Sequence, residues 1–379
     1  MRKNITRKQR QGKPEQTSKP KEAAASAAEP NTIGLDLGDR TSRICELNAS
    51  GAIAQETSIA TTKESMQQTF AAMPRTRIAL EVGTHSPWIS RLLSALGHEV
   101  IVANARQIKL ITESSRKNDR MDARMLARLA RVDPELLRPI RHRSERAQRD
   151  LMRIRVRAEL IRSRTAMINC ARGLTKAIGE RLPACDADSL CLERMSELPA
   201  ELQQLLKPLV ELIESATEKI EEADKQLEQI ARKHYPETEL LRQVHGVGTL
   251  IALTFVLTID DKDRFEKSRE VGCYVGLQPK RSQSGERDPQ LGITKEGDRY
   301  LRTMLVQAAH LVLNKRGPDT DLKRWGLQLA AHGGANAKKR AIVAVARKLA
   351  VLLHRLWVTG EVYEPLRNST AKERKSTAA

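Results

Sequence analysis

The sequence predicts an α/β domain followed by a mainly helical remainder, and three observations support this prediction. Between Thr32 and about Ala130, short apolar segments alternate with turns and then with helical patterns. Two long stretches with apolar residues spaced three and four apart follow. The last third of the 379-residue chain combines further helical patterns with a polar, basic loop. Strands alternating with helices indicate an α/β layer structure, and a period of 3.6 indicates helices that bury one face.

The α/β domain is predicted to span residues 31–140. Its first three segments, "TIGLDLG", "TSRICELNASG" and "AIAQETSI", are predicted strands joined by tight turns, which together form an antiparallel meander. A helix in "KESMQQTFAAM", a strand in "TRIALEVG", a helix in "SPWISRLLSALG" and a strand in "HEVIVANA" follow. The Ser-Pro pair favours a helix start, and Gly97 favours a helix end.

Residues 141–236 are predicted to form two long helices, at 144–182 and 198–234. The second helix carries a heptad seam made of Leu209, Ile213, Ala216, Ile220, Ala223, Leu227 and Ile230. Because such a seam is buried against another helix, the pair is either a helical hairpin or a coiled coil between subunits. Arginines recur on a second face of the first helix, at Arg146, Arg149, Arg153, Arg157 and Arg164. We interpret them as a nucleic-acid-binding face, the alternative being an ordinary solvated face.

Residues 237–365 are predicted to form a third, mainly helical domain. Gly246 and Gly248 lie between two apolar stretches, as in a helix-hairpin-helix, whose glycines let the backbone approach a phosphate. A purely structural turn is the alternative. Further helices are predicted at about 298–314 and 337–358. Residues 1–30 have too few apolar residues to offset the entropy cost of folding, so we expect a disordered basic arm. Residues 366–379 are a polar tail.

The composition narrows the class of protein. The chain has 66 Lys and Arg against 47 Asp and Glu, and its formal net charge of +19 favours a polyanion such as nucleic acid as partner. A basic protein that binds a membrane surface is the alternative. An aromatic content of 3% argues against base stacking as the main mode of recognition. No apolar run reaches the about 20 residues that span a bilayer. Five cysteines without a CxxC pair argue against a zinc site or a disulfide framework. We therefore expect a cytoplasmic protein with no membrane partner.

Four carboxylates are candidate metal ligands. Asp36 ends the first predicted strand and Glu81 ends a later one, so both project from the same edge if these strands are neighbours. Asp119 and Asp122 are three residues apart at a predicted helix start, which places them on one face. Carboxylates gathered at one edge repel each other unless cations neutralise them, and Mg²⁺ prefers oxygen ligands. The pattern therefore predicts a magnesium site that could activate a phosphodiester. A surface or capping role is the alternative for Asp119 and Asp122.

Ser284 is the candidate nucleophile. It precedes Gly285 in the polar segment "RSQSGERDPQLGITKEG", and no GxSxG motif or His–Asp partner stands near it in the sequence. The surrounding basic residues would offset the charge of a phosphate in the transition state. They are Lys280, Arg281, Arg287, Lys295, Arg299 and Arg302. A turn stabilised by the serine hydroxyl is the alternative.

Together these motifs resemble the DEDD transposases of the insertion-sequence-110 family, relatives of the pilin-gene invertases that are also known as bridge-RNA-guided recombinases. The resemblance covers about residues 31–325. It is specific because five sequence blocks occur in the order found in the family. They are "IGLDLGDR", "ALEVGTHSPWISRLL", "RKNDRMDARMLARL", "LLRQVHGVGTLIALTFV" and "YVGLQPKRSQSGERDPQLGITKEGDRYLRTMLVQAA". The basic arm before the first strand departs from the family pattern.

The resemblance implies a RuvC-like (RNase H-type) domain in which Asp36, Glu81, Asp119 and Asp122 bind Mg²⁺. It also implies a covalent 5′-phosphoserine link to DNA at Ser284, with Ser282 as the second choice. A bridge RNA would pair with donor and target DNA while the protein holds the backbones. The family further implies a dimer or tetramer that shares its active sites between subunits, in the nucleoid of a bacterial cell. The alternatives are a RuvC-type structure-selective nuclease without serine chemistry and a non-catalytic nucleic-acid scaffold.

Overall fold

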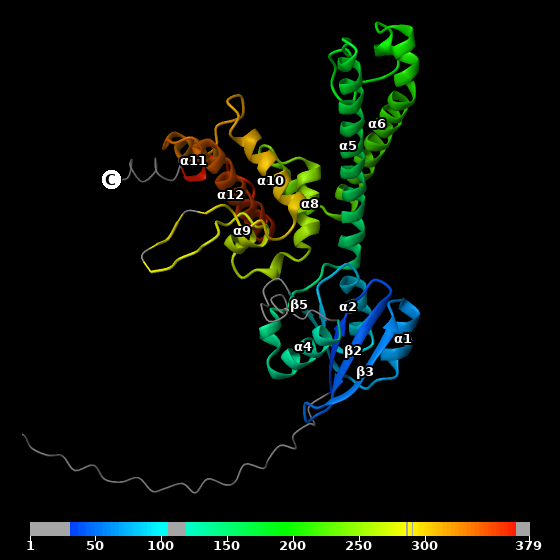
Figure 1. The fold of residues 1–379 in the computed structure, drawn as a ribbon. Coiled ribbons are helices and arrows are strands. Elements are labelled where there is room, and N and C mark those ends of the chain that lie inside the picture. The colour runs from blue at the N-terminus through cyan, green and yellow to red at the C-terminus, as the bar shows by residue number, and fades with distance from the viewer. Residues whose placement is uncertain (1–30, 105–118, 286, 290, 369–379) are drawn as a thin grey trace, which may run out of the picture. The chain divides into compact units, whose positions relative to one another are not determined.

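The computed structural model describes residues 31–104, 119–285, 287–289 and 291–368, with Asp119 and Arg120 described by their backbone alone (Figure 1). The predicted arm at 1–30 and the end of the predicted tail lie outside these residues. The chain divides into two compact units, and the boundary falls between His142 and Arg143. The predicted helical pair and the predicted C-terminal domain thus belong to one unit. No helix in the described ranges is long and apolar enough to cross a membrane.

The first unit is built on a five-stranded sheet with the order β3-β2-β1-β4-β5. Strands β1 to β3 are antiparallel and form the predicted meander, whereas β4 and β5 run parallel to β1. The predicted neighbourhood of the first and fourth strands is therefore confirmed. The strands are β1 (Thr32–Asp36), β2 (Thr41–Leu47), β3 (Ile53–Ala60), β4 (Arg77–Glu81) and β5 (Glu99–Ala103).

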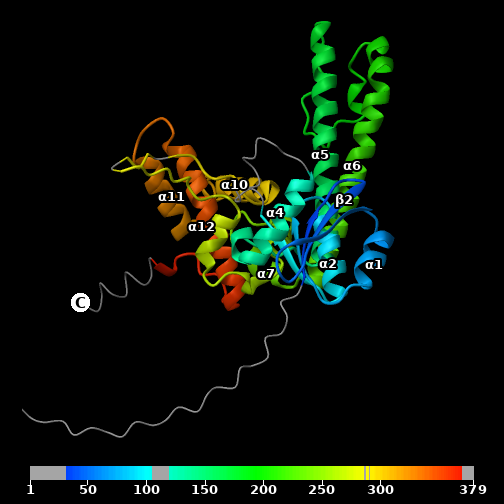
Figure 2. The ribbon, with the colours of Figure 1, turned by 60° about the horizontal axis from the view of Figure 1, so that its bottom comes forward.

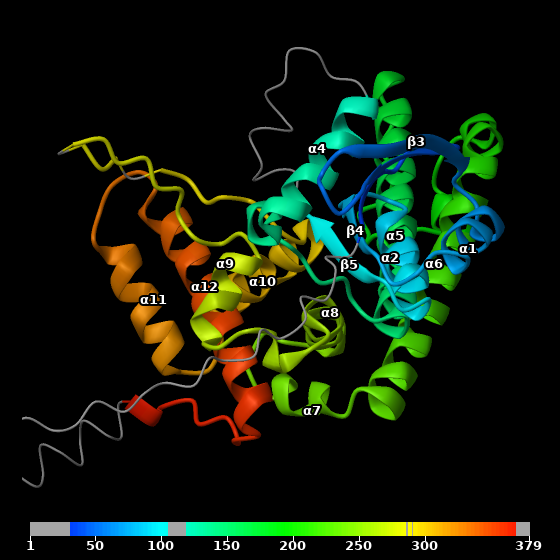
Figure 3. The same cartoon turned by 90° about the horizontal axis from the view of Figure 1, so that it is seen from below.

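Helices cover both faces of this sheet (Figure 3). Helices α1 (Lys63–Ala71) and α2 (Ser86–Ala95) lie on one face, where Phe70 and Leu93 pack on Ile33 and Leu80. Helix α4 (Asp119–Val132) lies on the other face and packs against β1, β2 and β4. The two faces follow from the alternation of side chains along each strand, which sends Ile33 and Leu35 to one side and Gly34 and Asp36 to the other.

The second unit begins with two long helices that run side by side, α5 (Glu145–Ala177) and α6 (Ala200–His234) (Figure 2). Ser144 caps α5 by accepting a hydrogen bond from the amide of Ala147, and the chain turns at Gly179, whose φ is 84°. The helix therefore ends earlier than the predicted residue 182. Ile213, Ala216, Ile220 and Leu227 of the predicted seam are buried, and Leu209, Ala223 and Ile230 are half-buried.

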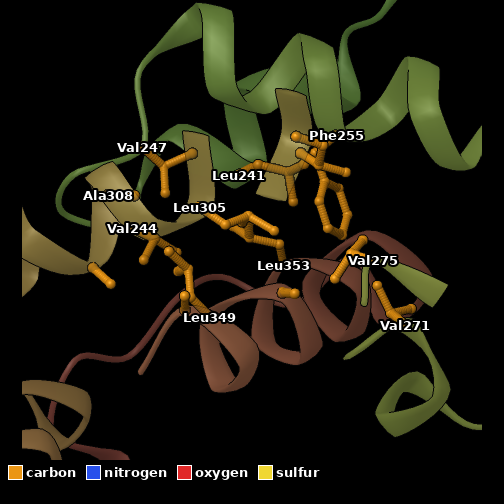
Figure 4. Close-up of a cluster of buried hydrophobic side chains, with 14 of the residues drawn as sticks. Leu241, Val244, Val247, Phe255, Val271, Val275, Leu305, Ala308, Leu349 and Leu353 are labelled. Atoms are coloured by element: carbon orange, nitrogen blue, oxygen red, sulfur yellow. The ribbon is translucent and has the colours of Figure 1, made fainter. Parts of the chain in front are cut away.

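The rest of the second unit is a helical domain with one large apolar core (Figure 4). Phe255, Leu305, Leu349 and Leu353 lie in this core, together with Val247 from the predicted glycine turn. The helices are α7 (Glu237–Arg242), α8 (Thr249–Ile259), α9 (Val271–Tyr274), α10 (Arg299–Val312), α11 (Asp321–Ala331) and α12 (Ala337–Thr359), and 3₁₀ turns lie at Lys262–Arg264 and Ser268–Glu270.

Helix α11 is absent from the sequence-based prediction. It contains Gly326, and a glycine costs a helix about 1 kcal/mol relative to alanine. A side-chain carbon at Gly326 would lie 2.5 Å from a methyl carbon of Val345 in α12 and 2.7 Å from one of Leu313. The glycine is therefore required by the close approach of α11 to α12, which local propensity does not reveal.

Candidate active site

Asp36 and Glu81 stand at the same edge of the sheet. Each is the last residue of its strand, β1 and β4, and the parallel register pairs Leu35 with Leu80 just before them. Both side chains are half-buried. Gly34 and Ala79 lie two residues before Asp36 and Glu81, and they pair across the two strands on the face covered by α4. Because every second side chain of a strand points to the same face, Asp36 and Glu81 also project from that face. The strand-end placement predicted for the two carboxylates is thus confirmed.

Helix α4 brings its N-terminus to this edge. Its central residues Ala123 and Ala127 press on Gly34, while Arg131 near its C-terminus bonds the carbonyl of Ala49 in the turn after β2. The helix therefore runs antiparallel to β1, and its first turn lies where β1 ends. Asp119 is the first residue of α4. The half-buried Asp122 directly precedes Ala123.

The donor chemistry at this edge suits a hard cation. Carboxylate oxygens from β1, β4 and α4 are the ligands that Mg²⁺ prefers. Among the side chains that the structure describes, no three His, Cys, Asp or Glu residues gather closely enough to hold a metal ion. The side chain of Asp119, one of the four predicted ligands, lies outside that set. The three backbone elements meet at this edge, and the magnesium site itself stays a prediction.

His85 is a residue at this edge that the sequence analysis missed. It lies in the loop between Glu81 and α2, and its Nε2 is 3.4 Å from a carboxylate oxygen of Asp39 in the loop after β1. Trp88 donates its indole N–H to Nδ1 of His85 over 3.2 Å. Because Nδ1 accepts, the neutral ring carries its proton on Nε2. The signal in the sequence is the run "THSPW" immediately downstream of "LEVG".

Ser284 lies at the tip of a long hairpin between α9 and α10, the narrow yellow loop in Figure 1. Its amide and carbonyl exchange two 3.1 Å hydrogen bonds with Arg287, and Gly285 takes a φ of 58°. Further bonds join Lys280 to Gly292 and Thr294 to Gln278. Ser282, Ser284 and Gly285 are exposed, and nothing lies within 4 Å of the place where a side chain at Gly285 would start. The predicted loop is thus a protruding ladder with the serine at its turn.

The base of the hairpin is rigidly joined to the helical core. A side-chain carbon at Gly276 would lie 2.1 Å from the carbonyl oxygen of Glu296, and Gly276 has a φ of 69°. Arg302 of α10 donates to the carbonyls of Val275 (3.0 Å) and Glu296 (2.8 Å), one on each side of the hairpin. Burial lowers the pKa of Arg302. Arg302, predicted to bind nucleic acid, therefore already clamps the hairpin.

The other basic residues predicted around Ser284 remain accessible. Lys280, Arg281, Arg287 and Lys295 are exposed along the hairpin, and so is Arg299 at the start of α10. Arg281 donates to the side chain of Gln283 over 2.7 Å and lies 3.7 Å from the carboxylate of Asp288. Their role in binding nucleic acid stays a prediction, and their exposed side chains leave them accessible.

The arginines of α5 divide into two groups. Arg157 forms two hydrogen bonds with Asp224 of α6, of 2.5 and 2.8 Å, and Arg164 donates to Thr217 of α6 over 3.1 Å. The side chain of Arg157 is 14% exposed, whereas that of Arg153 is 56% exposed. Arg146, stacked on the ring of Tyr235, and Arg149 are also exposed. Of the five predicted arginines, Arg146, Arg149 and Arg153 are therefore the exposed ones, and the last two pair with Glu145 and Asp150 of the same helix.

The two glycines of the predicted helix-hairpin-helix differ in their surroundings. They lie between α7 and α8, as predicted. A side-chain carbon at Gly246 would lie 2.9 Å from the carbonyl oxygen of Ala308 in α10, so this glycine permits close packing. Gly248 is exposed, has nothing within 4 Å of that position, and stands at the start of α8. Gly246 thus has the purely structural role given above as the alternative, whereas Gly248 is accessible to a ligand.

Comparison with known proteins identifies the family. The family model for DEDD transposases of IS110 elements matches residues 33–179, and the model described as Transposase IS116/IS110/IS902 family matches residues 238–323. The chain is 26% identical to the transposase for insertion sequence element IS1111A of Coxiella burnetii, over 87% of this chain and 90% of that protein. It is also 26% identical to the transposase for insertion sequence element IS1328 of Yersinia enterocolitica, over 75% and 84%. The chain belongs to the IS110/IS116 family of DEDD transposases, enzymes that act on DNA.

Proposed function

We propose that the protein cuts and rejoins the DNA of an insertion sequence through a covalent phosphoserine intermediate. Ser284 is the nucleophile in this proposal, and Asp36, Glu81, Asp119 and Asp122 form the acidic centre of a RuvC-like domain. The observation that supports the proposal is the backbone placement: Asp36 and Glu81 end the neighbouring strands β1 and β4, and the first turn of α4, with Asp122, lies where β1 ends. The exposed position of Ser284 at the hairpin tip supports its assignment as the nucleophile.

The carboxylates would hold Mg²⁺, which offsets the charge on the phosphate oxygens and so favours attack on phosphorus. The Ser284 oxygen forms a bond to phosphorus while the bond from phosphorus to the 3′ oxygen breaks. The serine loses its proton, and the departing 3′ oxygen gains one, which leaves a 5′-phosphoserine and a free 3′-hydroxyl. Attack by another 3′-hydroxyl reverses the step and joins new strands. Arg281 and Arg287 would offset the charge that develops on the phosphate.

The proposal includes a structured non-coding RNA that pairs with donor and target DNA, and a dimer or tetramer of the chain. The net charge of +19 and the exposed arginines of α5 support binding to such polyanions. The acids and the serine belong to different units of the chain, which is compatible with sites completed by a second subunit.

The test is trapping of the covalent intermediate. Full-length protein is incubated with Mg²⁺, end-labelled DNA of the element and the RNA transcribed from the DNA that flanks the coding region. The products are separated on a denaturing gel. Wild type and the matched control Ser282→Ala should form a protein–DNA adduct, and Ser284→Ala should form none. An adduct with Ser284→Ala would contradict the assignment of the nucleophile.

Two further outcomes decide between the alternatives. Cleavage without any adduct, in wild type and in Ser284→Ala alike, would favour a structure-selective nuclease without serine chemistry. Asp36→Ala should abolish cleavage while it preserves DNA binding. Cleavage that survives in Asp36→Ala would contradict the role of the acidic edge.

A further inference from the structure

A row of polar side chains crosses the sheet at the acidic edge. The antiparallel register pairs Asp36 of β1 with Arg43 of β2, and Arg43 with Ser58 of β3. Paired residues of neighbouring strands point to the same face, so the row continues the Asp36–Glu81 pair on the face of α4. Adjacent strands lie about 4.8 Å apart, which places the Arg43 backbone one strand from Asp36.

A small cavity opens along this row. Its volume is about 240 Å³, and the residues that line it come from β2, β3 and α4: Arg43, Ile44, Glu56, Thr57, Ser58 and Ala123. Drug-sized ligands occupy about 300–1,000 Å³, so this cavity suits a smaller group. Ala123 is the residue that follows Asp122, so the cavity directly adjoins the acidic edge.

The charges around the cavity leave one cation available. Glu56 is engaged by Arg124 of α4 in two hydrogen bonds, of 2.5 and 2.8 Å, and this contact raises the pKa of Arg124. Arg43 donates to the neutral hydroxyl of Ser58 over 3.2 Å. Within the part of the chain that the structure describes, no carboxylate lies within ion-pair distance of Arg43. Arg43 and Ser58 are both exposed.

We propose that Arg43 and Ser58 bind a phosphate of the DNA backbone that neighbours the reacting phosphate. A guanidinium carries five N–H donors in a planar fork, of which one meets Ser58, and a phosphate accepts such donors as a bidentate pair. A strand whose reacting phosphate lies over β1 and β4 passes next over β2, so this contact sets the register of the DNA on the acidic edge. The inference rests on the proposed function, since it takes this edge as the reaction site.

The test measures the salt dependence of DNA binding by the full-length protein. EDTA is present, so no cleavage occurs, and the probe is a fluorescent DNA duplex of the element end. Each phosphate contact contributes about −0.9 to the slope of log K against log salt. Arg43→Gln should make the slope shallower by about 0.9, and Arg43→Lys, which keeps the charge, should restore it. Ser58→Ala should weaken binding several-fold without changing the slope, because it removes a neutral partner.

Arg75→Gln is the matched control. Arg75 is also exposed but lies before β4, at the opposite edge of the same sheet, so the slope should equal that of wild type. An unchanged slope in Arg43→Gln, or an equal loss in Arg75→Gln, overturns the proposal. The series is repeated with a structured RNA of equal length, and a slope change confined to RNA overturns the assignment to DNA. This assay measures binding in EDTA and not cleavage. Its outcome is therefore distinguishable from a failure of the Asp36→Ala cleavage test of the proposed function.

Discussion

A side-chain carbon at Gly34 in β1 would lie 1.9 Å from the carbonyl oxygen of Ala123 in α4 and 2.6 Å from the amide nitrogen of Ala127. The helix therefore meets the strand backbone to backbone. This contact sets how far the first turn of α4, with Asp119 and Asp122, stands from the end of β1. The geometry of the acidic edge depends on a residue two positions before Asp36.

Replacing Gly34 by alanine should lower both stability and activity. The methyl group has no room unless α4 moves away, and such overpacking costs about 1–3 kcal/mol. Urea unfolding of the full-length protein measures this cost, and the adduct assay measures the loss at the displaced acidic edge. Gly83→Ala is the control for stability, because nothing lies within 4 Å of that position. Equal unfolding free energies for the two variants would contradict the close packing of α4 on β1.

Replacing Arg302 by methionine should loosen the serine hairpin. The carbonyls of Val275 and Glu296 lose their donor, and an unsatisfied half-buried polar group costs about 1–3 kcal/mol. Hydrogen exchange should become faster at the amides of Lys280 and Thr294, which join the two sides of the hairpin. Adduct formation should fall more than DNA binding. Arg299→Met, at an exposed neighbouring position, should leave exchange unchanged.

His354 should make the second unit sensitive to acid. This buried ring donates from Nε2 to the carbonyl of Lys262 (2.9 Å) and accepts at Nδ1 from Ser268 (3.0 Å). Burial lowers its pKa below the usual 6.5, and the Lys262 carbonyl and Asp263 offset this only in part. A lowered histidine pKa means that the folded state favours the neutral ring. Its stabilisation is complete above about pH 6.5 and is lost as the pH falls below that value.

Thermal unfolding of wild type and His354→Gln between pH 7.5 and pH 5 measures this dependence. The variant should be less stable at pH 7.5 but should lose less stability on acidification. Parallel acid dependence of the two proteins would show that His354 does not carry the effect.

Two arginines four residues apart on α5 should behave differently. Arg157→Gln breaks two hydrogen bonds between a mostly buried guanidinium and the half-exposed Asp224, so it should destabilise the second unit by about 1–2 kcal/mol. Arg153→Gln removes an exposed guanidinium that pairs with Asp150 of the same helix over 3.4 Å, so it should cost less than about 1 kcal/mol of stability and reduce the salt slope of nucleic-acid binding by about 0.9. Calorimetry and a binding titration on the same samples separate the two effects. A reversed pattern would contradict the division of the α5 arginines.

Several features of the protein follow from local sequence alone. The alternation of apolar and polar residues in 32–60 predicts the strands of the meander, because apolar residues recur at every second position when one face of a strand is buried. Asp36 and Glu81 close apolar runs, so their strand-end positions were predictable. The step of three and four from Leu209 to Ile230 predicts the buried side of α6. These signals are local because the backbone imposes its periodicity on neighbouring residues.

Other features depend on residues far apart in the sequence. Whether Arg157 faces solvent or α6 is decided by Asp224, which is 67 positions away. The row from Asp36 through Arg43 to Ser58 exists only in the strand register, and the meeting of α4 with Gly34 only in the packed domain. Ser284 stands at a hairpin tip because Gly276, Gly297 and Arg302 close its base. No pattern along the chain encodes these pairings, because they arise when apolar faces are buried together and bring otherwise unrelated polar groups into contact.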